Sequence, residues 1–246
     1  MTIRPIKWLL LVCLAGIGTV CAATPEERYT AQRQRMVREI AAEMRQTPTL
    51  MGKSSLDPRV MQALDTVPRH AFVPPHLQPH AYANRPLAIG YGQTISQPYI
   101  VAVMTNLLQL DKDEVVLEIG TGSGYQAAVL ATLARQVYSI EIIKELAEPA
   151  QERLQRLGYT NVEVRRSDGY AGWEAHAPFD AIMVTAAASH IPPPLLQQLK
   201  PGGRMLIPVG SPFQTQQLLL VTKDSAGQVT TRYVLPVAFV PLLGQH

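Results

Sequence analysis

The chain has 246 residues, 47% of them hydrophobic, which is enough to bury one substantial core, and it contains no internal repeat or low-complexity tract. Its formal net charge is +3, and it falls to +1 if an N-terminal segment containing Arg4 and Lys7 is removed, since 20 basic and 19 acidic residues remain. Neither value indicates a nucleic-acid-binding surface, and no basic face with interleaved aromatic residues is present. We expect a single domain that does not bind nucleic acid.

The N-terminus has the three regions of a secretory signal peptide. Arg4 and Lys7 precede an uninterrupted apolar stretch over residues 8–20, and small residues follow at Ala22 and Ala23. The stretch has 13 residues, fewer than the roughly 20 that a membrane-spanning helix needs. We expect residues 1–22 or 1–23 to be cleaved and the mature protein to be exported to the periplasm without a membrane attachment. A retained anchor and a cytoplasmic location are the alternatives.

Cysteine and histidine usage limits the chemistry of the mature chain. Both cysteines, Cys13 and Cys21, lie in the predicted leader, so no thiol remains for a disulfide, a metal site or nucleophilic catalysis. His76 and His80 are four residues apart, but Pro79 between them opposes a helical pair of metal ligands. We therefore expect no metal site.

Residues 24–110 are predicted to form a helical and lid segment that packs on a core of residues 111–246 within one structural domain. Apolar residues recur on one side of a helix from Pro25 to Gln46, and a second helix begins at Asp57-Pro58 and continues to Val67. Prolines keep the following chain irregular up to Tyr91, and a long loop of this kind is typical of a binding lid. A further helix is expected from Ile100 to Leu108.

A glycine-rich turn is the strongest functional signal in the sequence. Glu118-Ile-Gly120-Thr-Gly122-Ser-Gly124 follows an apolar strand and precedes the start of a helix at Gln126. Alternate glycines allow the backbone to approach a ligand closely, and the helix start presents free N–H groups. Tyr125 stands where the dinucleotide fingerprint would place its last glycine. The spacing therefore favours S-adenosylmethionine over a hydride-transfer cofactor.

Two acids follow the next strands at the same predicted edge of the sheet. Glu141 ends an alternating strand from Gln136, about 20 residues beyond the first glycine, which is the usual position of a ribose-binding carboxylate. Asp168 and Gly169 follow a third strand, Val162–Arg165, and we expect Asp168 to bind the adenine amino group. An ordinary Asp-Gly turn is the alternative for this pair.

The remaining elements complete an α/β fold. We expect a Rossmann-like, doubly wound methyltransferase fold with a mostly parallel sheet, an antiparallel edge strand and an N-terminal helical extension. Pro149 predicts that the helix before Leu157 begins near Glu148, with residues 144–147 as a separate turn. The other expected elements are a strand at 179–185, a short helix that starts at the prolines 192–194 and ends at 200–203, a strand closing at 209–210, and strands at 216–222 and 229–240.

Five blocks of sequence stand out in chain order: Val67-Pro-Arg-His-Ala-Phe-Val-Pro74, Ala81-Tyr82, Ile89-Gly-Tyr-Gly-Gln-Thr-Ile-Ser-Gln-Pro98, Val116-Leu-Glu-Ile-Gly-Thr-Gly-Ser-Gly-Tyr-Gln126 and Pro201-Gly-Gly-Arg-Met-Leu-Ile-Pro-Val-Gly210. Together these blocks resemble the protein-L-isoaspartate O-methyltransferases, and the similarity runs from about Met36 to Leu243. The fourth block contains the glycine turn, which many methyltransferases share, whereas Thr94-Ile-Ser-Gln-Pro98 is more particular to this family.

The resemblance implies methyl transfer from S-adenosylmethionine, leaving S-adenosylhomocysteine, to the α-carboxylate of L-isoaspartyl residues in damaged proteins or peptides. Matched by position, Ser96 is the catalytic residue, and Thr94 and Gln97 lie beside it to bind substrate. The cofactor-binding residues implied are Glu118, Gly120, Thr121, Gly122, Gly124, Glu141, Asp168 and Gly169.

The reaction itself asks little of the protein. A carboxylate with a pKa near ~4 is ionised at neutral pH and needs no general base, so positioning provides the catalysis. Ser96 would orient one carboxylate oxygen by a hydrogen bond, although it could also cap the helix that follows. A methyltransferase for a small-molecule carboxylate or hydroxyl, and a non-catalytic binding protein with this fold, are the rival functions. We expect a monomer.

Overall fold

The computed structural model describes residues 23–46, 55–211 and 214–244. The predicted leader lies outside the described residues except for Ala23. Among the helices in these ranges, none combines the length and the apolar character needed to cross a membrane.

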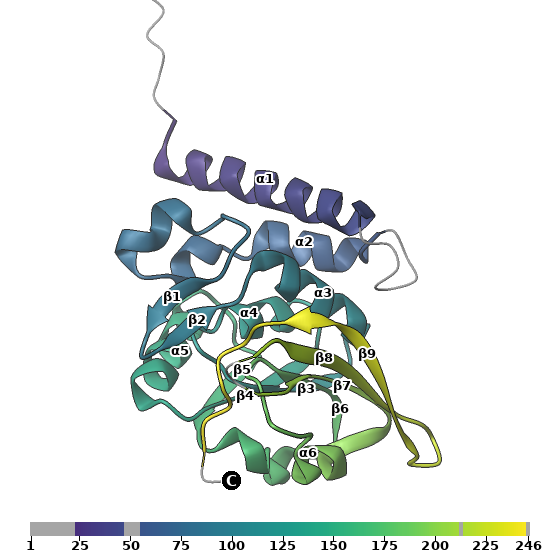
Figure 1. The fold of residues 1–246 in the computed structure, drawn as a ribbon. Helices are drawn as coiled ribbons and strands as arrows, with labels where there is room; N and C mark the ends of the chain where they lie inside the picture. The colour runs from purple at the N-terminus through teal and green to yellow at the C-terminus, as the bar shows by residue number, and fades with distance from the viewer. Residues whose placement is uncertain (1–22, 47–54, 212–213, 245–246) are drawn as a thin grey trace, which may run out of the picture.

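A twisted seven-stranded sheet forms the centre of the molecule, in the order β5-β4-β3-β6-β7-β8-β9 (Figure 1). The first five strands in this order are parallel, β8 is antiparallel to β7, and β9 is antiparallel to β8. The predicted mostly parallel α/β fold is confirmed, with antiparallel pairing extending over the last two strands. The strands are β3 (Val115–Ile119), β4 (Gln136–Glu141), β5 (Val162–Arg166), β6 (Phe179–Val184), β7 (Leu199–Val209), β8 (Gln216–Lys223) and β9 (Val229–Val237).

The central strands are apolar on both sides because helices cover both faces of the sheet. In β6, Ala181 and Met183 belong to one buried cluster, while Ile182 and Val184 belong to another. The first cluster also contains residues of the N-terminal helices, and the second contains Leu195 of α6. A parallel strand that is buried on both faces has a nearly continuous run of hydrophobic residues in its sequence. The helices are α1 (Pro25–Gln46), α2 (Pro58–Thr66), α3 (Pro98–Leu108), α4 (Tyr125–Ala131), α5 (Lys144–Arg156) and α6 (Pro193–Gln198).

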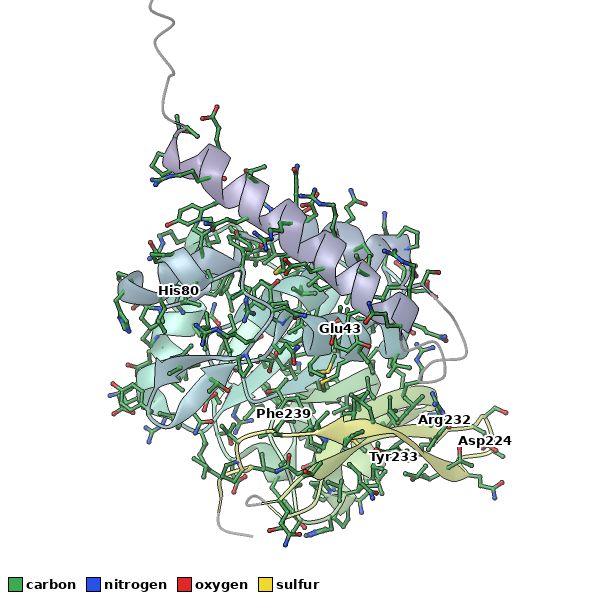
Figure 2. The ribbon with its side chains drawn as sticks, turned by 45° about the horizontal axis from the view of Figure 1, so that its top comes forward. Glu43, His80, Asp224, Arg232, Tyr233 and Phe239 are labelled. Atoms are coloured by element: carbon green, nitrogen blue, oxygen red, sulfur yellow. The ribbon has the colours of Figure 1, made fainter. Side chains whose placement is uncertain are left out.

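The N-terminal helices are stacked on one side of the sheet, with α1 outermost and lying across α2 (Figure 1). Helix α1 buries Met36, Ile40 and Met44 on a single face, as its sequence pattern predicts. Asp57 caps α2 by accepting a hydrogen bond from the Arg59 amide, with proline at the first helical position. The β8–β9 hairpin projects from the edge of the sheet and contains Asp224, Arg232 and Tyr233 (Figure 2). Phe239, which follows β9, lies closer to the centre of the molecule (Figure 2).

The segment between α2 and α3 is more regular than the sequence predicts. It contains two 3₁₀ helices, Arg69–Phe72 and Pro75–His80, followed by an antiparallel pair of short strands, β1 (Leu87–Gly90) and β2 (Gln93–Ile95). The expectation of irregular chain up to Tyr91 is therefore wrong for β1. The reason is tertiary: the paired residues Leu87 and Ile95 are both buried in the core.

Helix α5 corrects the prediction that a helix begins only near Glu148. It runs without interruption from Lys144 to Arg156 with Pro149 inside it. The amides of Leu146 and Ala147 both donate to the Ile143 carbonyl, and both side chains are buried. Packing of this first turn therefore offsets the hydrogen bond that the proline removes.

The chain after α6 also differs from its prediction. The helix ends at Gln198, and residues 200–203, expected at its end, belong to β7 instead. Leu199 pairs with Phe179 and Arg204 with Ala181, so the register shifts between them and the extra residues of β7 form an irregularity in the strand. Pairing with β6 thus overrides the local Pro-Gly-Gly signal.

Candidate active site

The glycine turn joins β3 to α4 at the carboxyl edge of the parallel strands. The amides of Gly120 and Thr121 donate to the Ile140 carbonyl of β4, at 2.8 and 3.2 Å. Gly120 has a φ of +97°, and a Cβ at this position would overlap the Thr185 hydroxyl. Thr185 donates that hydroxyl to the carbonyls of Ile119 and Gly120, at 3.0 and 2.7 Å. The turn therefore requires glycine and is fixed from two neighbouring strands.

A first cavity of about 720 Å³, solvent at its mouth included, opens against this turn. Its lining brings together most of the residues predicted to bind the cofactor. It is lined by the turn, the ends of β3 and β4, residues 93–96 and the C-terminal segment 240–243. The predicted residues in the lining are Gly120, Thr121, Gly122, Glu141, Gly169, Thr94 and Ser96.

Glu141 is fixed by the backbone at the edge of the first cavity. One carboxylate oxygen accepts from the Gly122 amide at 2.8 Å, and the other accepts from the Ile143 amide at 3.0 Å. A carboxylate has about four acceptor positions, so acceptor capacity remains for two hydroxyl donors of a ligand. This geometry suits the predicted ribose contact.

Asp168 and Gly169 have different positions relative to the first cavity. The Asp168 carboxylate accepts from the Tyr170 amide at 2.9 Å and caps a short 3₁₀ helix, and it is outside the lining. Gly169 is in the lining, and a Cβ there would overlap the Ile119 side chain. The pair is thus both an Asp-Gly turn and, through Gly169, one wall of the cavity.

Glu118 is fully buried behind the glycine turn and does not line the first cavity. The Ser139 hydroxyl donates to one of its carboxyl oxygens and lies 2.6 Å from the Thr121 hydroxyl, so a chain of hydrogen bonds connects Glu118 to the cavity wall. Its other oxygen has no hydrogen-bond partner among the described residues. Burial raises the pKa of Glu118 to about 8, with a smaller increase from Glu141, and the Ser139 bond partly opposes this.

Ser96 lies between the first cavity and a second one. The second cavity is lined by Gln97, by Pro86 and Thr215, and by residues 236–240 after β9. Thr94, Ser96, Thr185 and Val240 line both cavities. The predicted residues Ser96, Thr94 and Gln97 are therefore together at this boundary. The Ser96 side-chain hydroxyl has no hydrogen-bond partner within the described part of the chain, so it is available to a ligand.

The alternative role of Ser96 as a helix cap does not fit the geometry. The N-cap residue of α3 is Gln97, without a side-chain cap bond. The Tyr99 amide at the start of α3 donates instead to the Asn84 side chain at 3.0 Å. Asn84 in turn donates to Glu43 of α1 at 2.6 Å. Asn84, 15 residues before Tyr99 in the sequence, therefore accepts a hydrogen bond from the start of α3.

Several lining residues were not predicted from the sequence. Thr185 at the end of β6 and residues 240–243 beyond β9 both border the first cavity. Bonds from the Ala187 amide to Val240, and from the Leu242 amide to Ala187, hold the C-terminal segment there at 2.8 Å each. The apolar strand ending in small residues is a signal for Thr185, but no local pattern identifies the returning C-terminal segment.

The linings of the two cavities contain few charged side chains. Within the described residues, Glu141 is the one charged side chain in the lining of the first cavity, and the second cavity has none. A dinucleotide would bring a pyrophosphate for which this lining offers no basic side chain. The described residues also contain no cluster of three His, Cys, Asp or Glu side chains that could hold a metal.

The residues present fit S-adenosylmethionine. Its ribose hydroxyls need acceptors, which Glu141 provides, and its net positive charge suits a lining whose charged group is an acid. The start of α4 has no side-chain cap, as suits a helix start that binds a ligand, and the missing Cβ atoms of Gly120 and Gly169 let Thr185 and Ile119 pack closely and shape the wall. No other group is required to explain the first cavity.

Comparisons with known proteins agree on one family. The protein-L-isoaspartate(D-aspartate) O-methyltransferase family model matches residues 49–246. A Syntrophobacter fumaroxidans protein named protein-L-isoaspartate O-methyltransferase 2 is 63% identical over 238 residues, covering 97% of this chain and 96% of that protein. A solved protein-L-isoaspartate O-methyltransferase is 28% identical with a TM-score of 0.75, covering 86% of this chain and 66% of that one.

A second solved structure, from Plasmodium falciparum and in complex with S-adenosyl-L-homocysteine, has a TM-score of 0.70 at 24% identity, covering 87% of this chain and 98% of that one. At this identity it supports the fold. The family match spans most of the chain and agrees with the glycine turn and the Ser96 block. The chain therefore belongs to the protein-L-isoaspartate O-methyltransferase family.

Proposed function

We propose that this chain transfers a methyl group from S-adenosylmethionine to the free α-carboxylate of L-isoaspartyl residues in damaged proteins and peptides. The backbone amide nitrogen then attacks the resulting ester and displaces methanol, and the succinimide that forms hydrolyses partly to normal aspartate. The observation that carries the proposal is that Ser96 lines both cavities and that its hydroxyl has no hydrogen-bond partner within the described residues. The first cavity fits the methyl donor, and we assign the second cavity to the isoaspartyl segment of the substrate.

The protein's task is to position an acceptor that is already reactive. The substrate carboxylate has a pKa near ~4 and is ionised at neutral pH, so no residue needs to remove a proton. When bound, S-adenosylmethionine supplies an electrophilic methyl group on sulfur. Ser96 donates a hydrogen bond to one carboxylate oxygen and leaves the other free to attack. Thr94 and Gln97 lie beside it and bind the substrate backbone.

The cofactor is held mainly by the backbone and by one acid. Glu141 binds the ribose hydroxyls, and residues 120–123 of the turn lie against the donor, whereas Gly124 packs against Leu154 of α5 outside the lining. Glu118 acts from behind this turn through Ser139 and Thr121, and it fixes the wall without contacting the ligand. Asp168 shapes the turn that presents Gly169 to the adenine side.

Methylation of paired peptides tests this function. The peptides share one sequence and differ in an L-isoaspartyl or a normal aspartyl residue, and methyl ester formation is measured with labelled S-adenosylmethionine. Only the isoaspartyl peptide should react. Equal reaction of both peptides, or reaction only of a small carboxylic acid, would support the small-molecule alternative. Absence of S-adenosylmethionine binding in a calorimetric titration would support the non-catalytic alternative.

We further propose that the mature protein is exported and acts as a monomer on proteins outside the cytoplasm. The basic residues Arg4 and Lys7, the apolar stretch 8–20 and the small residues at 22–23 support export. N-terminal sequencing of the mature protein should give a start at Ala23 or Thr24. A start at Met1 in a cytoplasmic fraction would contradict export.

A further inference from the structure

Arg69 is a fully buried arginine on the Ser96 side of the active site. It lies in the first 3₁₀ helix after α2 and has no exposed surface. It lines neither of the two cavities, so substrate and cofactor do not touch it directly. Any contribution that it makes to the reaction must pass through another residue.

The guanidinium joins two separate segments of the chain. Its Nε donates to the Ala81 carbonyl at 2.8 Å, and one Nη donates to the Ser96 carbonyl at 2.8 Å. Ala81 follows the second 3₁₀ helix, whereas Ser96 follows β2. The planar fork of arginine can satisfy both carbonyls at a fixed angle, which a lysine ammonium on a flexible stem cannot do.

The guanidinium also packs against an aromatic ring. Its carbon lies 4.8 Å from the centre of the Tyr125 ring, on the first residue of α4. Among the described residues, no carboxylate forms an ion pair with Arg69. Burial lowers the pKa of Arg69 to about 10, so it remains charged at neutral pH.

This arrangement is not explained by stability alone. A buried charge is costly, and among the described residues no carboxylate offsets it, although its two bonds satisfy backbone carbonyls that an apolar side chain would leave without this partner. What the guanidinium adds is a pair of directed bonds, one of which ends on the backbone of Ser96, the residue that lines both cavities. The Ser96 side chain itself has no bond within the described residues that would fix it.

We propose that Arg69 is a positioning residue for methyl transfer. By holding the Ser96 carbonyl, it fixes the backbone from which the Ser96 hydroxyl points to the boundary of the two cavities. The inference rests on the proposed function. It assigns to the arginine of Val67-Pro-Arg-His-Ala-Phe-Val-Pro74 a role that acts only through Ser96.

A double-mutant cycle tests the inference. Arg69→Lys keeps the charge and removes the fork, and it is made both in the natural chain and in the Ser96→Ala background. In the natural chain we expect kcat on the isoaspartyl peptide to fall about tenfold or more, while KM for the peptide changes less than about threefold. In the Ser96→Ala background the same change should lower kcat less than about twofold, since the group that Arg69 positions is gone.

Two further measurements separate positioning from a general loss of structure. Calorimetric affinity for S-adenosylhomocysteine should stay within about twofold of the natural chain, because Arg69 lies outside the cofactor lining. Arg59→Lys is the matched control: Arg59 also donates to a distant carbonyl, that of Leu110 at 3.0 Å, and lines neither cavity. It should leave kcat unchanged.

Equal reductions of kcat by Arg69→Lys in the two backgrounds would overturn the inference, as would an unchanged kcat in the natural chain. If Arg69→Lys does not fold, Arg69→Met replaces it in the cycle, because it removes the buried charge. Failure of both to fold would assign Arg69 to the core alone and overturn the inference. Failure of the natural chain to methylate the isoaspartyl peptide would instead contradict the proposed function.

Discussion

The cofactor side of the active site is built from strand ends and turns that follow one another along the chain, whereas the Ser96 side is assembled from distant segments. On the first side, Gly120 follows β3, Glu141 is the last residue of β4, and Gly169 lies three residues after the end of β5. On the second side, Ser96 depends on Arg69 for its carbonyl, and the helix after it depends on Asn84.

The two walls of the active site are therefore determined in different ways. Parallel strands place their carboxyl ends at one edge, so a fold of this class makes a nucleoside-binding wall almost automatically. The opposite wall has no such rule, and it is held by side chains that bond to backbone atoms far away in the sequence. Changes on the first side should therefore alter donor binding, and changes on the second should alter turnover or local stability.

The largest expected effect is that of Ser96→Ala on turnover. Loss of a hydrogen bond to a charged group costs about 1.5–3 kcal/mol, which corresponds to a roughly ten- to hundredfold lower kcat. The free energy of unfolding should hardly change, because Ser96 is not the cap of α3. Affinity for S-adenosylhomocysteine should also hardly change, because the proposed partner of the Ser96 hydroxyl is the substrate carboxylate and not the donor. Steady-state kinetics and calorimetry measure both. An unchanged kcat would remove Ser96 from the mechanism.

Glu141→Ala changes the cofactor side of the active site and should weaken binding of the donor. Two ribose hydroxyls lose their acceptor, so S-adenosylhomocysteine affinity should fall by roughly tenfold or more. Glu141→Gln is the matched variant, since it keeps the size of the side chain but loses the charge and half of the acceptor atoms; it should show an intermediate affinity. If calorimetry finds the affinity of Glu141→Ala unchanged, the ribose contact is wrong.

The stability of the folded protein should depend on pH through Glu118, the buried acid behind the wall of the first cavity. Its pKa is raised from 4.5 to about 8 by burial, so between these values the folded protein retains a proton that the unfolded chain has released. Stability should therefore fall as the pH rises through this window. Glu118→Gln cannot ionise, and its melting temperature should exceed that of the natural chain by several degrees more at pH 8 than at pH 5. A difference that does not vary with pH would contradict the raised pKa.

The smallest effect is expected for Asn84→Ala, which removes the acceptor for the Tyr99 amide. Loss of a helix cap costs about 1 kcal/mol, or roughly 2–4 °C in melting temperature for a chain of this size. Urea denaturation of Asn84→Ala and Ser96→Ala, side by side, shows which residue supports α3. Equal destabilisation by the two variants would restore the capping role to Ser96.

The same comparison explains how much could be predicted from the sequence. The glycine turn, Glu141 and the sheet could be predicted because their signals are local and periodic. The strand β1, the helical path through Pro149 and the entry of residues 200–203 into β7 could not be, because burial or pairing with another strand decides each of them. Local propensity is overridden where tertiary contacts are strong.

The candidate active site likewise contains residues that could be predicted from the sequence and residues that tertiary structure alone places there. Ser96, Thr94 and Gln97 were identified through a family resemblance, and their position between two cavities depends on the tertiary structure. Thr185 and the C-terminal residues 240–243 reach the first cavity only because β6 and the segment after β9 end beside it. The burial of Glu118 behind the turn likewise follows from tertiary structure, because both faces of β3 are covered and every residue after Val115 is buried.

A crystal structure with S-adenosylhomocysteine and an isoaspartyl peptide tests the central claim most directly. The product should lie against Gly120 and Glu141 in the first cavity. The peptide should enter through the second cavity with its free α-carboxylate about 2.5–3.0 Å from the Ser96 hydroxyl. A carboxylate bound away from Ser96, or a product outside the first cavity, would contradict the account.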